Sequence, residues 1–171
     1  MIRTNNHHPY TLEQMRNAEE LLTDIDLVYH SAQKLKREYT ATIAIAGPEG
    51  YPDHSSERSG VCKKCSLDAP RTLERMDTLT RRYRLLLNML SALKKDLALI
   101  RGTREFRLLL YRFKKGLNAA QTTAEMNCSM RNYYRIRKQA LCIVCASLEK
   151  TPLGREVLLH GSSAAIHKYF K

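Results

Sequence analysis

The sequence predicts an all-α fold, with two long N-terminal helices followed by a C-terminal helix-turn-helix. Apolar residues recur at three- and four-residue spacing along long segments, and few segments alternate with period two. The 171 residues include only 7 Gly and 5 Pro, and no Gly-rich strand–helix motif or internal repeat is visible. A chain of this length forms one or two domains with a modest core.

The first long helix is predicted over residues 11–46, within an N-terminal segment 1–46. Thr11 and Gln14 have the spacing of a capping box. The apolar positions are close to a heptad repeat, which is typical of a coiled coil. This helix therefore either packs on the second long helix of the same chain or pairs with another subunit in a homo-oligomer. Its predicted apolar positions are Met15, Ala18, Leu22, Ile25, Tyr29, Ala32, Leu35, Tyr39 and Ile43.

Residues 47–67 concentrate Gly, Pro, Ser and charge, so they predict a mobile linker and a domain boundary. Asp68 and Pro70 then start a second long helix, since Asp is a good N-cap and Pro fits the first turn. This helix runs to about Ile100. Its apolar stripe comprises Leu73, Met76, Leu79, Tyr83, Leu86, Leu87, Leu90, Leu93 and Leu97.

A shorter helix is predicted from Arg104 to Lys115, capped by Thr103 and ended by Gly116 in the left-handed conformation. It belongs to a helical DNA-binding domain over residues 68–148. The last segment, 149–171, contains Pro152, Gly154 and Gly161, which predict a flexible tail.

Residues 117–141 have the layout of a helix-turn-helix, whose second helix enters the DNA major groove. Asn118 is placed to cap the first helix, Asn127 to adopt the left-handed turn, and Ser129 to cap the second helix. The alternative is an ordinary amphipathic hairpin with a solvated basic face. The predicted apolar face of the second helix comprises Tyr133, Ile136, Ala140, Leu141, Val144 and Leu148.

The charge distribution favours a polyanionic partner. The chain has 29 Lys and Arg against 17 Asp and Glu, a net charge of +12. Residues 101–140 carry ten of these cations and two acids, so two thirds of the excess lies there. No apolar run is long enough to span a membrane, and the first ten residues have no signal-peptide core. We therefore expect a soluble cytoplasmic protein without a membrane partner.

The segment from Phe106 to Leu148 resembles the helix-turn-helix of region 4 of bacterial sigma-70 factors. Within that group it is most similar to phage late-gene transcription regulators of the RinA and ArpU type. An apolar helix, EFRLLLYRF, ends in KKGL and is followed by NAAQTTAEM, the turn NCS and MRNYYRIRKQAL. The pattern departs from the family at Thr122 and Cys128, where bulky aliphatics are usual, and at Asn127, where Gly is usual. Thr122 and Cys128 can still be buried.

The resemblance implies an activator of phage late, packaging or lysis genes. It would bind double-stranded DNA near the nucleoid of a bacterial host cell and contact RNA polymerase. One alternative is a DNA-packaging component similar to a terminase small subunit, which would assemble into a ring. A second alternative is a protein-interaction module whose basic face meets an acidic partner.

Seven polar side chains of the hairpin are candidate DNA ligands. Ser129 begins the second helix, where a helix N-terminus favours phosphate. Arg suits the edge of guanine and Asn that of adenine, so three residues of the second helix are assigned to bases. The remaining three would reach the backbone or the groove wall. The assigned base readers are Arg131, Asn132 and Arg135, and the other DNA-binding candidates are Gln121, Ser129, Tyr134 and Lys138.

The five cysteines predict reduced thiols. Cys62 and Cys65, with His54 nearby, are weak candidates for metal binding, and Cys142 and Cys145 repeat the spacing. The second pair lies in a predicted apolar helix in which Cys145 should face the core, so we predict no metal site. No Ser/His/Asp arrangement, phosphate-binding Gly loop or spaced acidic pair stands out. The sequence therefore predicts neither an enzyme nor a cofactor.

Overall fold

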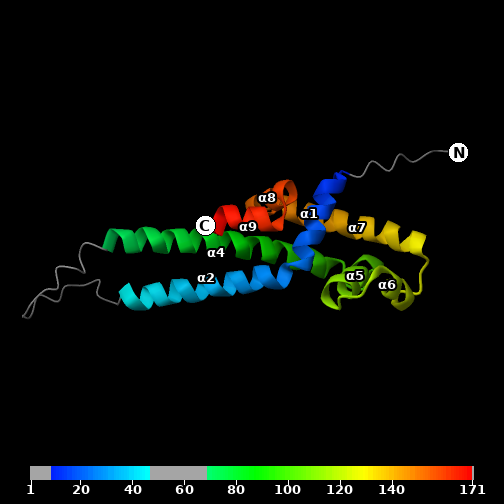
Figure 1. Ribbon diagram of the computed structural model, residues 1–171, viewed down its shortest axis with the longest axis horizontal. Coiled ribbons are helices and arrows are strands. Elements are labelled where there is room, and N and C mark those ends of the chain that lie inside the picture. Colours follow the sequence, from blue (N-terminus) through cyan, green and yellow to red (C-terminus); the bar gives the residue numbers. More distant parts are fainter. Residues whose placement is uncertain (1–8, 47–68, 171) are drawn as a thin grey trace, which may run out of the picture.

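A computed structural model describes residues 9–46 and 69–170. Within these ranges the chain forms eight α-helices and one π-helical turn, with no strand, so the predicted all-α fold is confirmed. Figure 1 shows an elongated arrangement. The elements are α1 (Leu12–Thr23), α2 (Ile25–Ala46), α4 (Ala69–Leu99), α5 (Arg104–Leu109), the π-helical turn η1 (Leu110–Lys114), α6 (Ala119–Glu125), α7 (Met130–Glu149), α8 (Pro152–His160) and α9 (Ser162–Phe170).

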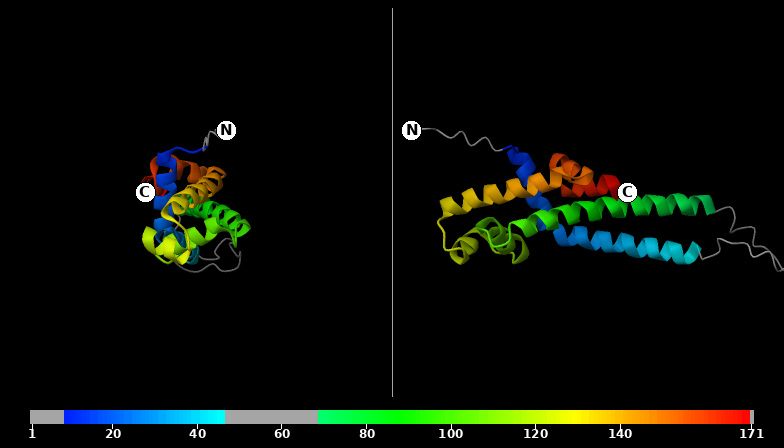
Figure 2. Two further views of the ribbon diagram at one scale, coloured as in Figure 1. Left: turned by 90° about the vertical axis from the view of Figure 1, so that its right-hand side faces the viewer. Right: turned by 180° about the vertical axis from the view of Figure 1, so that it is seen from behind.

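The two longest helices, α2 and α4, pack side by side in opposite directions (Figure 1). α7 and α8 lie on the other side of α4, and α1 packs against α7 and α8. The view from behind in Figure 2 shows α5 and α6 at one end of the molecule, below the start of α7. α2 therefore follows the first of the two predicted arrangements, in which the N-terminal segment packs on the second long helix of the same chain.

The expectation of one continuous helix over residues 11–46 is wrong, because the chain divides at Asp24. The Thr11–Gln14 capping box is present, and α1 ends where the Asp24 N–H donates to the carbonyl of Glu20. The Asp24 carbonyl then accepts from the Val28 N–H at 3.0 Å and opens α2. The break lets α1 pack on α7 and α8 while α2 packs on α4. It also changes the buried face, so that Val28 is fully buried whereas Tyr29 is 56% exposed.

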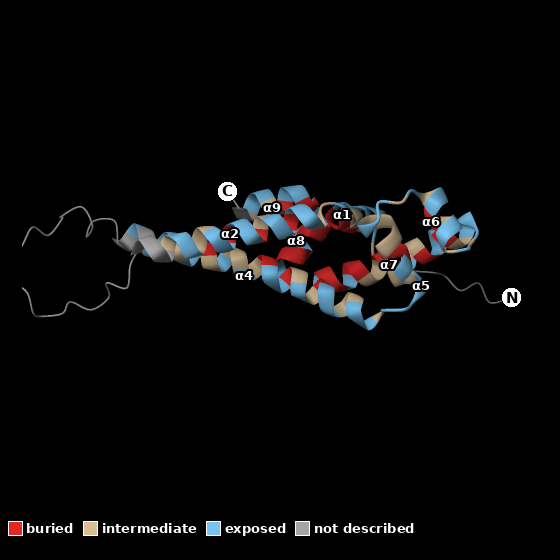
Figure 3. Ribbon diagram, turned by 90° about the horizontal axis from the view of Figure 1, so that it is seen from below, coloured by how far each residue is buried: buried red, intermediate tan, exposed pale blue. Residues whose placement is uncertain are grey.

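The main core lies where α1, α4, α7 and α8 meet, and buried residues concentrate there in Figure 3. Burial of large apolar side chains in this region is the main stabilising contribution, at about 1.5–3 kcal/mol for each. The predicted stripe of α4 is only partly buried: Leu86 and Leu93 lie in this core, but Leu73, away from it, is 63% exposed. The largest fully buried apolar side chains of this core are Leu21, Leu86, Met89, Leu93, Leu148, Leu153, Val28, Val144 and Val157.

The structure differs from the expected flexible tail, because residues 152–170 form two packed helices. Thr151 caps α8 by accepting the Gly154 N–H at 3.1 Å, and Pro152 occupies the first turn, where a missing N–H costs little. α8 packs closely on the end of α7: a Cβ at Gly154 would lie 2.1 Å from the carbonyl oxygen of Leu148. The Pro and Gly residues thus mark a helix start and a close helix contact.

Some predictions fall on residues that the structure does not describe. These are the linker 47–67, the cap at Asp68, and the cysteine pair Cys62 and Cys65 with His54. Among the helices of residues 9–46 and 69–170, none has an apolar stretch that could cross a bilayer.

Candidate nucleic-acid interface

The N-terminal half of α7 rests on a small core of its own. Leu108 from α5 packs with Tyr133 and Ile136 from α7, and all three side chains are at most 2% exposed. Ala119, Met126 and Cys128 cover this cluster from α6 and the turn. The cluster is separate from the main core. It holds α5, α6 and the start of α7 together as one unit.

The predicted caps and turn are confirmed. The Asn118 side chain accepts the Gln121 N–H at 2.9 Å, and the Gln121 side chain accepts the Asn118 N–H at 3.0 Å. Asn127 has a φ of 47°, the left-handed conformation that ends α6. Ser129 then caps α7 by accepting the Asn132 N–H at 3.3 Å. These bonds satisfy backbone donors that a helix start leaves unpaired, so they position both helices on either side of a tight turn.

Thr122 and Cys128, which differ from the bulky aliphatics of the pattern that this segment resembles, are accommodated locally. Thr122 is fully buried, and its hydroxyl donates to the carbonyl of Asn118 at 2.8 Å. Its polar atom is therefore satisfied while its methyl group faces the interior. Cys128 is half-buried against the Leu108–Tyr133–Ile136 cluster and acts there as a small apolar side chain.

The predicted helix from Arg104 to Lys115 is helical to Lys114, but it changes geometry partway. Thr103 caps α5 and Gly116 has a φ of 69°, as predicted, and α5 itself ends at Leu109. The π-helical turn η1 follows, closed by a bond from the Lys115 N–H to the carbonyl of Leu110 at 3.0 Å. Arg112 stabilises the segment that follows η1 by donating to the carbonyl of Leu117 at 3.0 Å.

Most of the predicted DNA-binding side chains share one exposed stripe. On α7, residue 131 is three and four positions before residues 134 and 135, which are four and three positions before residue 138, so the four lie along the same side of the helix. Arg131, Tyr134 and Arg135 are exposed, and Lys138 is half-buried. Gln121 and Ser129 are exposed near the turn. We name the set Arg131, Asn132, Tyr134, Arg135 and Lys138 the α7 stripe.

Members of the α7 stripe also interact with one another. The Arg135 guanidinium donates to the Asn132 side-chain oxygen at 2.9 Å. The bond uses one of the two lone pairs of the Asn132 oxygen, so the oxygen, the amide N–H groups and the rest of the guanidinium can still bind a ligand. Tyr134 packs edge-on against the buried Tyr133, with ring centroids 5.2 Å apart. The stripe is thus partly pre-oriented by contacts within α7.

Arg137 has a different role from its basic neighbours. Its Nε donates to Glu19 of α1 at 3.3 Å, and its Nη2 forms a short ion pair with the other oxygen of the same carboxylate. This bidentate pair joins α1 to α7 across 118 positions of sequence. The sequence does not indicate that α1 is a neighbour of the stripe. The apolar face of α1 predicts that this helix is packed, but no local pattern identifies α7 as its partner.

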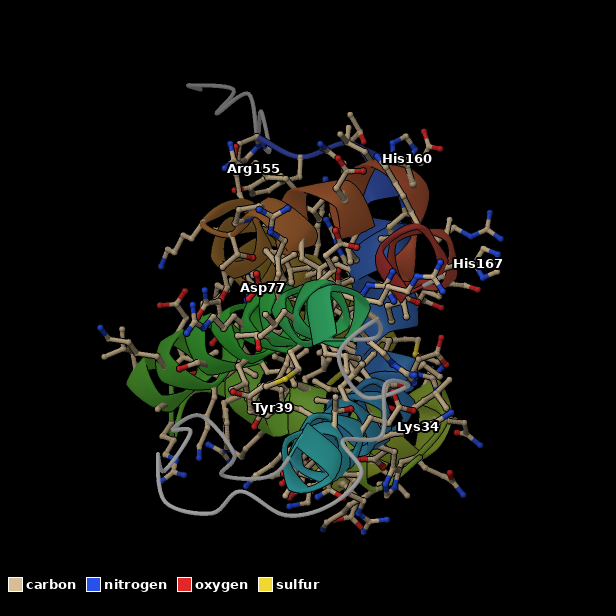
Figure 4. All side chains as sticks on the ribbon, turned by 90° about the vertical axis from the view of Figure 1, so that its left-hand side faces the viewer. Lys34, Tyr39, Asp77, Arg155, His160 and His167 are labelled. Carbon is tan, nitrogen blue, oxygen red and sulfur yellow. The ribbon has the colours of Figure 1, made fainter. Side chains whose placement is uncertain are left out.

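Basic side chains also surround the unit. Arg104, Arg107, Lys114 and Lys115 are exposed on and after α5, and Lys115 lies 4.6 Å from the ring centre of Tyr111. Two acids, Glu105 on α5 and Glu125 on α6, belong to the same unit. Figure 4, viewed from the opposite end of the molecule, shows Lys34 and His167 pointing outward. The end of the molecule that holds α5, α6 and the α7 stripe therefore presents cations on a helix whose start is fixed by the Ser129 cap and by a separate small core.

The buried thiols on α7 are poorly suited to metal binding. Cys145 is fully buried, as predicted, and burial raises its pKa to about 12. Burial also raises the pKa of Cys142. Zinc binds the thiolate, which such burial disfavours. In the parts of the chain that the structure covers, no three His, Cys, Asp or Glu side chains gather into a group that could hold a metal.

Comparison with known proteins finds no matching family, curated protein or solved structure. The similarity of residues 106–148 to regulators of the RinA and ArpU type therefore stays a prediction from the residues themselves. What α6, the turn and α7 do has to be inferred from their geometry and charge.

Proposed function

We propose that this protein is a sequence-specific regulator of transcription that binds double-stranded DNA through α6, the turn and α7. In this proposal the three elements act as a helix-turn-helix, and the first half of α7 enters the major groove. The observation that carries the proposal is the α7 stripe. It places exposed Arg131 and Arg135 on a rigidly capped helix whose apolar side is buried in a separate small core.

The chemistry of the stripe suits base recognition. Arginine can donate two bonds to the edge of guanine, and asparagine can pair with the edge of adenine. The bond from Arg135 to Asn132 holds these two side chains together, so they would address neighbouring base pairs. Gln121 and Ser129, beside the turn, would donate to phosphates and set the position of the helix on the duplex.

The cellular role follows from the resemblance. We infer activation of phage late, packaging or lysis genes in a bacterial host, with a separate surface for RNA polymerase. A packaging component is the second candidate, because the α2–α4 hairpin exposes large apolar side chains, Tyr29, Leu73 and Leu87, that suit assembly into an oligomer. The mass of the assembly in solution separates the two, since a closed ring of about eight or more subunits favours packaging.

The proposal is tested by selecting fragments of phage and host genomic DNA with the purified protein at ~150 mM salt, where weak phosphate-only binding fades. We expect enrichment upstream of a gene cluster. Enrichment at a packaging start site would support the second candidate. A double variant, Arg131→Ala with Arg135→Ala, is the control and should lose the enrichment. No enrichment by the wild-type protein would contradict DNA recognition and leave the basic face as a protein-binding surface.

A further inference from the structure

A cleft of about 500 Å³ separates the end of the α7 stripe from α1. From α7 it is lined by Tyr134 and Lys138, two members of the stripe, and from α1 by Arg16. Arg16 is exposed and Lys138 is half-buried. The cleft therefore joins a cation of the N-terminal helix to the predicted DNA-binding surface, although the two are more than a hundred residues apart in sequence.

The charge of the cleft is positive. Its charged lining comprises Arg16, Glu19, Arg137 and Lys138. The single acid, Glu19, is paired with Arg137 in the bidentate ion pair, which neutralises both. Among the described residues, neither Arg16 nor Lys138 forms an ion pair, so the cleft retains two cations. With the Tyr134 hydroxyl as a further donor, this set suits an oxyanion such as phosphate.

The position of Arg16 relative to α7 indicates which part of a duplex it would meet. From Arg131 to Lys138 is seven residues, or about 10 Å along the helix. If α7 enters the major groove by its first turns, as proposed, Lys138 at the end of the stripe lies near the rim of the groove. A cation beyond Lys138, on the far side of the cleft, would then meet the sugar–phosphate wall of the groove rather than the base edges.

We propose that the cleft between α1 and α7 is a phosphate-binding site that holds the DNA backbone, with Arg16 as a contact residue. This inference rests on the proposed function. α1 then has two roles: its inner face packs in the core through Met15 and Ala18, and Arg16 extends the DNA surface. The Glu19–Arg137 pair positions α1 over α7 and removes the negative charge of Glu19 from the path of the phosphate.

The test measures the affinity of the full-length chain for two duplexes of equal length, one carrying the selected sequence and one scrambled. The variants are Arg16→Ala, Arg16→Lys and Arg75→Ala. Arg75 is an exposed arginine on α4 and matches the change in charge outside the cleft. We expect Arg16→Ala to lower the affinity for both duplexes by the same factor, roughly three- to tenfold. The slope of log affinity against log salt concentration should fall in magnitude by about one. Arg16→Lys should retain most of the affinity, and Arg75→Ala should resemble the wild type.

Two results would overturn the contact between the cleft and the DNA backbone. In the first, Arg16→Ala has the same affinity for both duplexes as Arg75→Ala. In the second, Arg16→Ala binds more tightly than the wild type, which would mean that α1 obstructs DNA. Calorimetric titration with inorganic phosphate separates the sources of the anion. Phosphate binding that is lost in Arg16→Ala, with unchanged duplex affinity, would assign the cleft to a free anion and contradict the backbone contact.

Failure of the broader proposal has a different signature. If the wild-type protein binds the candidate and scrambled duplexes equally, sequence recognition is contradicted. The effect of Arg16→Ala can still be measured in that case, because the loss of a phosphate contact lowers the affinity for both duplexes equally.

Discussion

The two halves of α7 differ in what surrounds them. Its first half carries the exposed stripe and is supported by the small cluster of Leu108, Tyr133 and Ile136. Its second half is buried in the main core through residues such as Val144 and Leu148. One helix thus carries the exposed α7 stripe at one end and lies in the main core at the other. Substitutions in the first half of α7 should therefore change DNA binding, and substitutions in the second half should change stability.

The largest expected effect comes from the buried half. Leu148→Ala removes a side chain that is 1% exposed and leaves a cavity among α4, α7 and α8. We expect the free energy of unfolding to fall by about 2–5 kcal/mol. Urea denaturation measures this. Leu99→Ala is the control, because Leu99 is 79% exposed, and it should change stability little. Equal effects of both substitutions would contradict the assignment of this half to the core.

The boundary between the halves is tested at the Glu19–Arg137 pair. Both side chains are partly buried, with exposed fractions of 20% and 32%, and the contact is bidentate. Glu19→Gln should lower the free energy of unfolding by about 1–2 kcal/mol, because Arg137 loses its counter-charge. Glu38→Gln breaks the exposed pair with Lys34 and should have a smaller effect. If the two variants are equally stable, the pair does not anchor α1.

The smallest effect is expected at the end of the buried half, and it depends on pH. Lys150, which follows α7, donates to Asp96 of α4 at 2.6 Å, and this bond lowers the pKa of Asp96. A lowered pKa stabilises the fold above the unfolded value of about 3.9 and is lost as pH falls through the folded pKa. Asp96→Asn should therefore be less stable than the wild type near neutral pH, with the difference vanishing in acid. A difference that persists below the folded pKa would exclude the charge as its cause.

Local signals predicted the hairpin well. The Asn118 and Ser129 caps and the left-handed Asn127 depend on bonds within three residues, so the sequence alone indicates them. The apolar face of α7 is also correct, because helical periodicity determines which side can be buried. All six predicted positions are buried, namely Tyr133, Ile136, Ala140, Leu141, Val144 and Leu148.

Features that depend on distant partners could not be predicted in the same way. The heptad-like pattern continues through Asp24, but the chain breaks there, where Ser162 of α9 lies 3.3 Å from the Asp24 carboxylate. The placement of Arg16 beside Lys138 also depends on how α1 packs on α7. α8 does have a local signal, because Thr151 before Pro152 is a favourable helix start.

Recognition of base pairs by the first half of α7 can be tested with one direct measurement. The affinities of the wild-type protein and Arg131→Ala are compared on the selected duplex and on duplexes substituted at each base pair in turn. We predict a loss of about 1–3 kcal/mol that is concentrated at one base pair, with unfolding stability unchanged, because Arg131 is exposed. A loss spread evenly over all positions, or no loss, would contradict the claim.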